Sequence, residues 1–218
     1  MVQVKAARSY DSSRRREQAE RNRAAVLDAA WRLFEERGYG ATTVSAVAAA
    51  AGVSAETVYK AFGGKAGLVR ALWERGLAGR GMVHAQKRSD AMMREHEADS
   101  QAIARAWGGF ITEVMPATAP VLLLVRAAAA TAPEMARLRV ELEDSRLARM
   151  EANARFLADH HHLRAGLTVE YARDILFAYS APELYELLVL RQGWSPENYG
   201  VFIGESVSAA LLSAPAEP

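Results

Sequence analysis

Cysteine is absent from the 218 residues. Disulfides and thiolate metal sites are therefore excluded, which fits a reducing compartment, and we expect a cytoplasmic protein. The first residues contain no apolar run and do not resemble a secretory signal. The longest apolar run, from Pro120 to Ala132, is interrupted by Arg126 and is too short to span a bilayer. We therefore expect no membrane contact.

The sequence also lacks the usual signatures of an enzyme. It has no cysteine nucleophile, no G-x-S-x-G segment, no phosphate-binding glycine loop and no metal-ligand spacing. His160, His161 and His162 are consecutive, so they point in different directions around a helix, and a solvated helix end explains them better than a metal site. We expect no catalysis, no cofactor and no metal.

Strand-forming patterns are scarce as well. All seven prolines lie at or after Pro116, runs of β-branched residues are few, and alanine and arginine are abundant, which favours helices. The formal net charge is +1, but residues 1–80 carry 14 Lys+Arg and 8 Asp+Glu, whereas residues 81–218 carry 13 and 18. The asymmetry favours a basic module that meets a polyanion, although chance variation of surface charge would also produce it.

The most informative stretch is residues 43–62, TVSAVAAAAGVSAETVYKAF. Thr43 and Ser54 are placed as N-caps of two short helices, and Gly52 lies where the chain must turn. The second helix has a polar outer face formed by Ser54, Glu56, Thr57, Tyr59 and Lys60. This arrangement is typical of a helix-turn-helix, whose second helix can enter a major groove; the alternative is an ordinary αα-hairpin.

The flanking segments favour the helix-turn-helix. Residues 17–37 form an amphipathic helix that ends at Gly38 and can cover the two short helices. Another helix starts at Gly64, with Lys65 in its first turn, where a positive charge opposes the helix dipole and a phosphate contact would explain it. Residues 1–16 read as a flexible basic arm that either contacts DNA or is a solvated tail.

The run from Arg23 to Gly76 resembles the DNA-binding domain of TetR-family transcriptional regulators. The shared motifs are LFxxRGY, the paired threonines, AxxAGVS, TVYxxFxxK and the leucine after that lysine. The resemblance covers roughly residues 20–76. Ala61 and Gly64 depart from it, because many relatives have His or Tyr, and Ser or Asn, at these positions.

The resemblance implies an all-α fold with a three-helix helix-turn-helix domain at 17–77 and a larger helical ligand-binding and dimerisation domain at 78–218. It implies a ligand-responsive regulator, a repressor that binds a palindromic operator as a homodimer and is released by a small, apolar effector. Thr43, Tyr59 and Lys65 then contact phosphates, and Ser54, Glu56, Thr57 and Lys60 form the recognition face. Lys60 and Thr57 suit base edges. Tyr59 has the alternative of a half-buried aromatic residue.

The second domain carries no comparable motif. We expect helices near 82–96 and 99–113, a break between Pro116 and Pro120, and a helix at 121–130. Capping boxes at 131–134 and 180–183 predict further helix starts, and Thr168 and Ser195 are placed as N-caps. Candidate pocket residues are methionine, aromatic and aliphatic side chains, with core packing as the alternative for each: Met92, Trp107, Phe110, Ile111, Met115, Leu122, Phe156 and Tyr179.

The last helices are more apolar than a single buried stripe requires, which favours a self-complementary interface, although they could also be core. The candidate dimer contacts are Leu184, Leu187, Leu188, Trp194, Phe202 and Leu211. A different function remains open, that of an architectural helical dimer that binds DNA without sequence preference. Substitution of Lys60 separates the two: a base-reading lysine changes preference at one position, whereas a phosphate contact affects all sequences alike.

Overall fold

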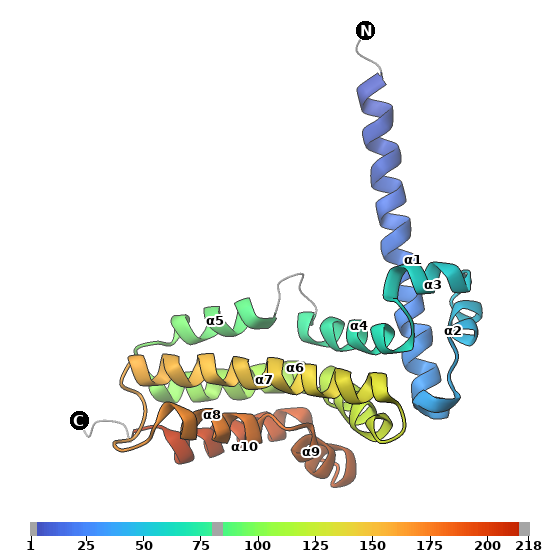
Figure 1. Cartoon of the computed structure of the whole chain (residues 1–218). Coiled ribbons are helices and arrows are strands. Elements are labelled where there is room, and N and C mark those ends of the chain that lie inside the picture. Colours follow the sequence, from blue (N-terminus) through green and yellow to red (C-terminus); the bar gives the residue numbers. More distant parts are fainter. Residues whose placement is uncertain (1–3, 80–84, 214–218) are drawn as a thin grey trace. The chain divides into compact units, whose positions relative to one another are not determined.

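The computed structural model describes residues 4–79 and 85–213, and it describes side chains within 14–79 and 86–213. The chain divides into two compact units, Met1–Leu72 and Trp73–Pro218. Within the described residues the regular structure is helical (Figure 1), and the one β-type contact is an isolated bridge between Leu163 and Leu212. The all-α fold class is therefore confirmed. The division falls inside a helix, five residues before the expected boundary at 77.

The first unit contains α1 (Val4–Ala41), α2 (Val44–Ala50), α3 (Ala55–Phe62) and the beginning of α4 (Lys65–Ala78). The helical path of α1 is broken at Gly38, where φ is 74°, a value that glycine adopts at no steric cost. Gly38 therefore ends the first helix as predicted. Upstream, α1 continues back to Val4, so residues 4–16 of the expected flexible basic arm are helical, and Arg14, Arg15 and Arg16 are exposed.

The core of the first unit is built from the predicted stripe of α1 and the inner faces of the three following helices. Its buried side chains include Val26, Leu27, Ala30, Leu33, Phe34, Val47, Ala48, Val58, Leu68 and Val69. Thr42 closes the end of α1, because its buried hydroxyl lies within hydrogen-bonding distance of the carbonyls of Leu33 (3.0 Å) and Gly38 (2.8 Å). Thr42 thereby gives a partner to carbonyls that a helix end leaves unpaired.

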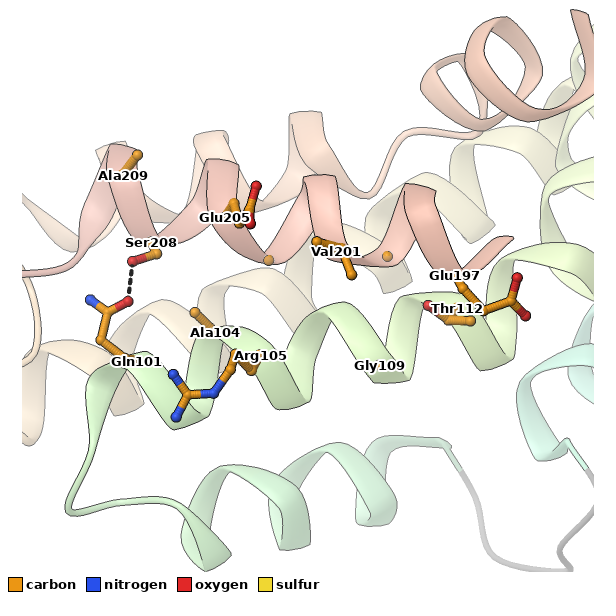
Figure 2. A pocket seen from close by; sticks show the side chains of 12 residues that line it. Gln101, Ala104, Arg105, Gly109, Thr112, Glu197, Val201, Glu205, Ser208 and Ala209 are labelled. Atoms are coloured by element: carbon orange, nitrogen blue, oxygen red, sulfur yellow. Dashed lines mark hydrogen bonds between the residues drawn. The ribbon is translucent and has the colours of Figure 1, made fainter. Parts of the chain in front are cut away.

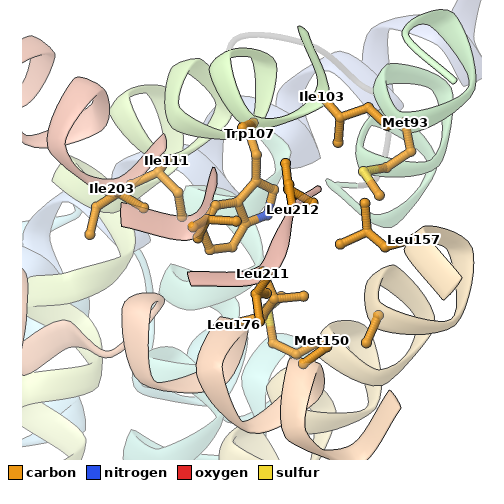
Figure 3. Close-up of a cluster of buried hydrophobic side chains, with 14 of the residues drawn as sticks. Met93, Ile103, Trp107, Ile111, Met150, Leu157, Leu176, Ile203, Leu211 and Leu212 are labelled. Atoms are coloured by element: carbon orange, nitrogen blue, oxygen red, sulfur yellow. The ribbon is translucent and has the colours of Figure 1, made fainter. Parts of the chain in front are cut away.

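The second unit contains α5 (Ala85–Glu95), α6 (Ser100–Ala129), α7 (Pro133–Asp159), α8 (Val169–Tyr179), α9 (Pro182–Tyr185), a π-helical turn η1 (Glu186–Arg191) and α10 (Pro196–Leu211). Helix α6 packs against both α7 and α10, and α7 packs against α8 (Figure 1). Figure 3 shows the core between these helices, where Trp107 of α6 lies among side chains of α7, α8 and α10.

The break expected between Pro116 and Pro120 is wrong, because α6 runs without interruption through both prolines. Each proline removes one backbone donor, but burial of the helix on several sides outweighs this local cost. The hydroxyl of Thr118 donates to the carbonyl of Val114 at 2.8 Å within this stretch. By length and composition α6 could cross a membrane, yet many of its apolar side chains form the core of this unit.

Two glycines of α10 allow its backbone to approach that of α6 closely. A Cβ added at Gly200 would lie 1.8 Å from Oγ1 of Thr112, and one added at Gly204 would lie 2.8 Å from the carbonyl oxygen of Ala104. On α6, a Cβ at Gly108 would lie 2.3 Å from the carbonyl oxygen of Gly200. The two helices can therefore pack this closely only because these positions are glycine.

The predicted helix starts are confirmed in part. Thr168 accepts a hydrogen bond from the amide of Tyr171, and Ser195 accepts one from the amide of Asn198 (3.1 Å), so both are N-caps. The two capping boxes are wrong, because α7 and α9 begin after the alanines at 132 and 181, each directly before a proline. Proline fixes φ at the first helical position and sets the start there without a side-chain cap.

Candidate DNA interface and ligand cavity

The helix-turn-helix predicted from residues 43–62 has the capping pattern that the sequence indicates. The amide of Ala46 donates to Oγ1 of Thr43, and the amide of Thr57 donates to Oγ of Ser54, both at 3.1 Å. Gly52 turns the chain at φ 68°. Each short helix therefore begins at a side-chain cap, which satisfies backbone donors that would otherwise lack a partner.

The polar side chains of α3 lie on one exposed face. Val58 is fully buried, and the exposed residues around it are Ser54, Glu56, Thr57, Tyr59 and Lys60. Tyr59 is 56% exposed, so its side chain is accessible to a phosphate, and the phosphate role of Tyr59 stays a prediction. The hydroxyls of Ser54 and Thr57 share a 2.8 Å hydrogen bond, which leaves the ammonium group of Lys60 as the strongest donor on this face.

The end of α3 is held tightly against the start of α4. Gly63 ends the helix in the left-handed conformation, with φ 74°. A Cβ added at Gly67 would lie 1.6 Å from the carbonyl oxygen of Phe62, so this position accepts only glycine. The guanidinium of Arg23 lies 4.6 Å from the centre of the Phe62 ring. Sequence reasoning did not identify Gly67, because the clash depends on the angle between two helices.

Lys65 has a partner that the sequence did not reveal. Its Nζ donates to the carbonyl oxygen of Tyr39 at 2.8 Å and lies 4.2 Å from the centre of that ring. The Tyr39 ring in turn stacks on Phe34, with centroids 5.8 Å apart. An ammonium group has three donors, so the contact with Tyr39 leaves capacity for a phosphate. The phosphate role of Lys65 stays a prediction.

The second unit contains a partly open cavity of about 140 Å³, here called the inner cavity. Its lining comes from α4, α5, α6, α7 and Ser180 at the end of α8. Five predicted pocket residues line it: Trp107, Phe110, Ile111, Met115 and Leu122. Trp73 and Leu77 of α4 also contribute.

Three predicted pocket residues do not line the inner cavity: Met92, Phe156 and Tyr179. All three pack, partly buried, against the hydrophobic core instead. Phe156 stacks on His160, with ring centroids 4.0 Å apart. Core packing, the alternative for each of these residues, is what the structure shows, because the direction of a side chain could not be derived from helix periodicity.

Polar residues of α7 form part of the cavity wall, and sequence reasoning missed them. Arg146, Arg149 and Asn153 line the cavity together with Met150. Burial lowers the pKa of Arg146 to about 10, so it stays charged at neutral pH, and its Nη1 donates to the carbonyl of Ser180 at 2.8 Å. Arg149 pairs with Asp90 at 2.7 Å. The position of Asn153 on the apolar stripe of α7 could have indicated from the sequence that this helix contributes polar groups to the cavity.

A second, wider hollow of about 720 Å³ lies along the contact between α6 and α10 (Figure 2). Its lining includes exposed residues of both helices, among them Arg105, Glu197, Val201 and Glu205. The hydroxyl of Ser208 donates to Oε1 of Gln101 across it at 2.6 Å (Figure 2). Because exposed side chains rim this hollow, it is a surface groove rather than an enclosed ligand site.

The candidate dimer contacts fall into three groups. Leu187 and Trp194 are exposed, at 49% and 38%. Leu184, Leu188 and Phe202 are half-buried against the core, and Leu211 is fully buried within it. Leu211 is therefore wrong as a contact residue, because no part of it is accessible to a partner. Other exposed apolar residues of these helices are Tyr171, Leu190 and Val201.

Comparison with known proteins finds a family match in the first unit. Residues 26–72, which span the C-terminal part of α1, the helix-turn-helix and the start of α4, match the model of the bacterial regulatory proteins of the tetR family. Residues 26–72 therefore match a TetR-type DNA-binding domain. A relative from Bacillus subtilis (strain 168), the uncharacterized HTH-type transcriptional regulator YvkB, is 40% identical over 65 residues. That match covers 30% of this chain and about a third (34%) of the relative.

Solved structures resemble the chain over most of its length. The SmeT–triclosan complex has 21% sequence identity and a TM-score of 0.67, covering 90% of this chain and 98% of that one. Native NalD, the secondary repressor of the MexAB-OprM multidrug efflux pump in Pseudomonas aeruginosa, has 19% identity and a TM-score of 0.69, covering 90% and 100%. At such identities the likeness establishes a shared TetR-type fold.

Proposed function

We propose that this chain is a ligand-responsive, DNA-binding transcriptional regulator that represses its target by binding a palindromic operator as a homodimer. The observation that carries the proposal is the exposed polar face of α3, presented by a capped helix-turn-helix within the stretch that matches the TetR family. The named neighbours are consistent with this role, since NalD is a repressor and SmeT binds triclosan.

In the proposed complex α3 enters the major groove. Lys60 donates to guanine O6 or N7, and the side chain of Thr57 contacts a thymine methyl group. Ser54 and Glu56 lie at the start of the same face, where Glu56 either accepts from a cytosine amine or stabilises the helix N-terminus. Thr43, Tyr59 and Lys65 contact phosphates and fix the register of α3 without reading sequence.

The proposed dimer uses the exposed apolar side chains of α8, η1 and α10. Tyr171, Leu187, Leu190, Trp194 and Val201 are between 38% and 60% exposed in the single chain. Burial of such side chains is worth about 25 cal/mol for each Å² of apolar surface. A homodimer carries two copies of α3, and binding to a palindromic operator requires them to enter successive major grooves about 34–36 Å apart.

Helix α4 provides a route from ligand to DNA. Its first residue, Lys65, belongs to the DNA-binding unit, and Trp73 and Leu77 line the inner cavity. A ligand that prefers one position of α4 favours one placement of the DNA-binding unit. Affinity for the operator then falls by the ratio of ligand affinities in the two states, and the apolar side chains of the lining favour an effector with an apolar body.

Footprinting on the DNA that flanks the chain's own gene tests the proposal, with Lys60→Ala as the variant and Lys87→Ala, an exposed lysine of α5, as the matched control. We expect protection of a near-palindromic site, and a Lys60→Ala protein that loses preference at one base pair of each half-site. An equal loss on every sequence would instead favour the architectural DNA-binding function.

A further inference from the structure

Two buried hydrogen-bond donors on α7 lack a partner among the described residues. They are Nε of Arg149 and Nδ2 of Asn153, and both residues line the inner cavity. Asn153 is only 2% exposed, and its amide oxygen is 3.5 Å from the hydroxyl of Ser89, at the outer limit of a hydrogen bond. Because the two residues are four positions apart, they lie on the same face of the helix. Buried donors are nearly always paired, so this pair suggests a missing acceptor.

The positive charges that α7 contributes to the cavity lining also suggest an occupant that accepts hydrogen bonds. Arg146 lies on the same face of α7, and its guanidinium contacts the carbonyl of Ser180 and the ring of Phe177, 4.1 Å from the ring centre. Among the described residues that line the cavity, none is Asp or Glu. Asp90, outside the lining, pairs with Arg149, and Glu143 lies one turn before Arg146 on α7. The wall thus carries two guanidinium groups, of which only that of Arg149 is paired with a carboxylate at hydrogen-bonding distance.

Most of the lining that α6 contributes is apolar. Trp107, Phe110, Ile111 and Met115 of α6 line the cavity, and Thr118 is the polar residue of α6 in the lining. The volume of about 140 Å³ is close to that of an engineered apolar cavity of about 150 Å³ that takes up benzene. An occupant of this size has a body of about one ring.

We propose that the inner cavity binds a small organic acid, with its carboxylate at Asn153 and Arg149 and its apolar body against α6. The carboxylate accepts from Nδ2 of Asn153 and Nε of Arg149, and the charge of Arg146 attracts it. A carboxylate has about four acceptor positions, so it can satisfy both unpaired donors at once. This inference rests on the proposed function, because it names the chemical class of the effector.

Calorimetric titration of the full chain in a HEPES buffer tests the proposal with three pairs of probes: phenylacetate, 3-phenylpropionate and octanoate, each beside its neutral amide. We expect at least one acid to bind about tenfold more tightly than its amide. Asn153→Leu, which keeps the volume of the side chain and removes the donor, should weaken the acid about tenfold and leave the amide unchanged. Arg146→Met should also weaken binding of the acid and leave binding of the amide unchanged.

Arg137→Met is the matched control, because Arg137 is an exposed arginine of the same helix that does not line the cavity. It should bind every probe as the wild type does. If no acid binds more tightly than its amide to the wild-type protein, the proposal is overturned, and this comparison requires no variant to fold.

Operator footprinting on the same sample separates the claim about the ligand class from the claim about the regulatory function. DNA protection without acid preference overturns only the ligand class, whereas acid preference without protection of any site overturns only the proposed regulatory function.

Discussion

Lys65 ties the start of α4 to the end of α1 through Tyr39. Its Nζ donates to the Tyr39 carbonyl at 2.8 Å and lies 4.2 Å from the centre of the same ring. The lysine thus stands at the junction of the helices that position the helix-turn-helix. A positive charge in the first turn of a helix is unfavourable because it opposes the helix dipole. The contacts of Lys65 with the Tyr39 carbonyl and ring offset this effect.

Replacement of Lys65 with methionine should therefore reduce stability as well as DNA affinity. Removal of a hydrogen bond from a charged group costs about 1.5–3 kcal/mol, and the partial exposure of this site favours the lower value. Denaturant unfolding measures this change. If Lys65 also binds a phosphate, the slope of log affinity against log salt becomes shallower by about 0.9 for each phosphate that the variant no longer neutralises. Lys87→Met is the control, and equal stability of both variants would contradict the Tyr39 interaction.

Gly67→Ala should disturb the placement of α3. The new Cβ would lie 1.6 Å from the carbonyl oxygen of Phe62, so α3 and α4 must move apart. Overpacking of this kind costs about 1–3 kcal/mol, and we expect operator affinity to fall by more than about tenfold. Gly40→Ala, in the same unit and with open space at its Cβ, is the matched control and should leave both quantities nearly unchanged. Thermal unfolding and a gel-shift titration compare them; equal behaviour of the two variants would refute the tight α3–α4 junction.

Gly200→Ala should loosen the contact between α6 and α10. Its Cβ would lie 1.8 Å from Oγ1 of Thr112 and 2.6 Å from the carbonyl oxygen of Gly108. We expect the free energy of unfolding to fall by about 1–3 kcal/mol. Gly109→Ala, on the open side of α6, should instead raise it by about 0.5–1 kcal/mol, because alanine loses less backbone freedom in a helix. Urea denaturation gives both values, and a shift of the same sign in both variants would show that the two backbones are not in close contact.

Leu190→Glu should convert the proposed dimer to a monomer. Leu190 is 53% exposed on η1, and a carboxylate in its place would lose its water in the proposed interface without gaining a partner of opposite charge. Val140→Glu is the control, because Val140 is 52% exposed on α7, outside that face. Sedimentation velocity at micromolar concentration should show a monomer for the first variant and a dimer for the second. A wild-type chain that sediments as a monomer would refute the interface itself.

Local signals in the sequence predicted the helix-turn-helix well. Thr43, Gly52 and Ser54 act through their immediate neighbours, and the structure confirms each as a cap or a turn. The proline rule failed at Pro116, because burial of α6 against several neighbours outweighs the missing backbone bonds. Where a helix begins is determined by the residues next to its first turn, whereas the continuity of a helix through proline depends on the tertiary packing around it.

Long-range relationships could not be derived from periodicity. Phe110 and Phe156 both suited a pocket, but their directions depend on how α6 and α7 pack, and only Phe110 lines the inner cavity. A preference for methionine and aromatic side chains also passed over Asn153, although an asparagine on an apolar stripe is itself informative. Likewise, the 1.6 Å clash at Gly67 arises from a helix crossing that no sequence pattern encodes.

The most direct test of the central claim is a footprint of the purified protein on the DNA flanking its own gene. We predict protection of two half-sites about one helical turn apart, with the centres of the two α3 helices about 34–36 Å from each other. Protection should decrease when an acid that binds the inner cavity is added. A folded dimer that protects no near-palindromic site at low salt would contradict the proposed function.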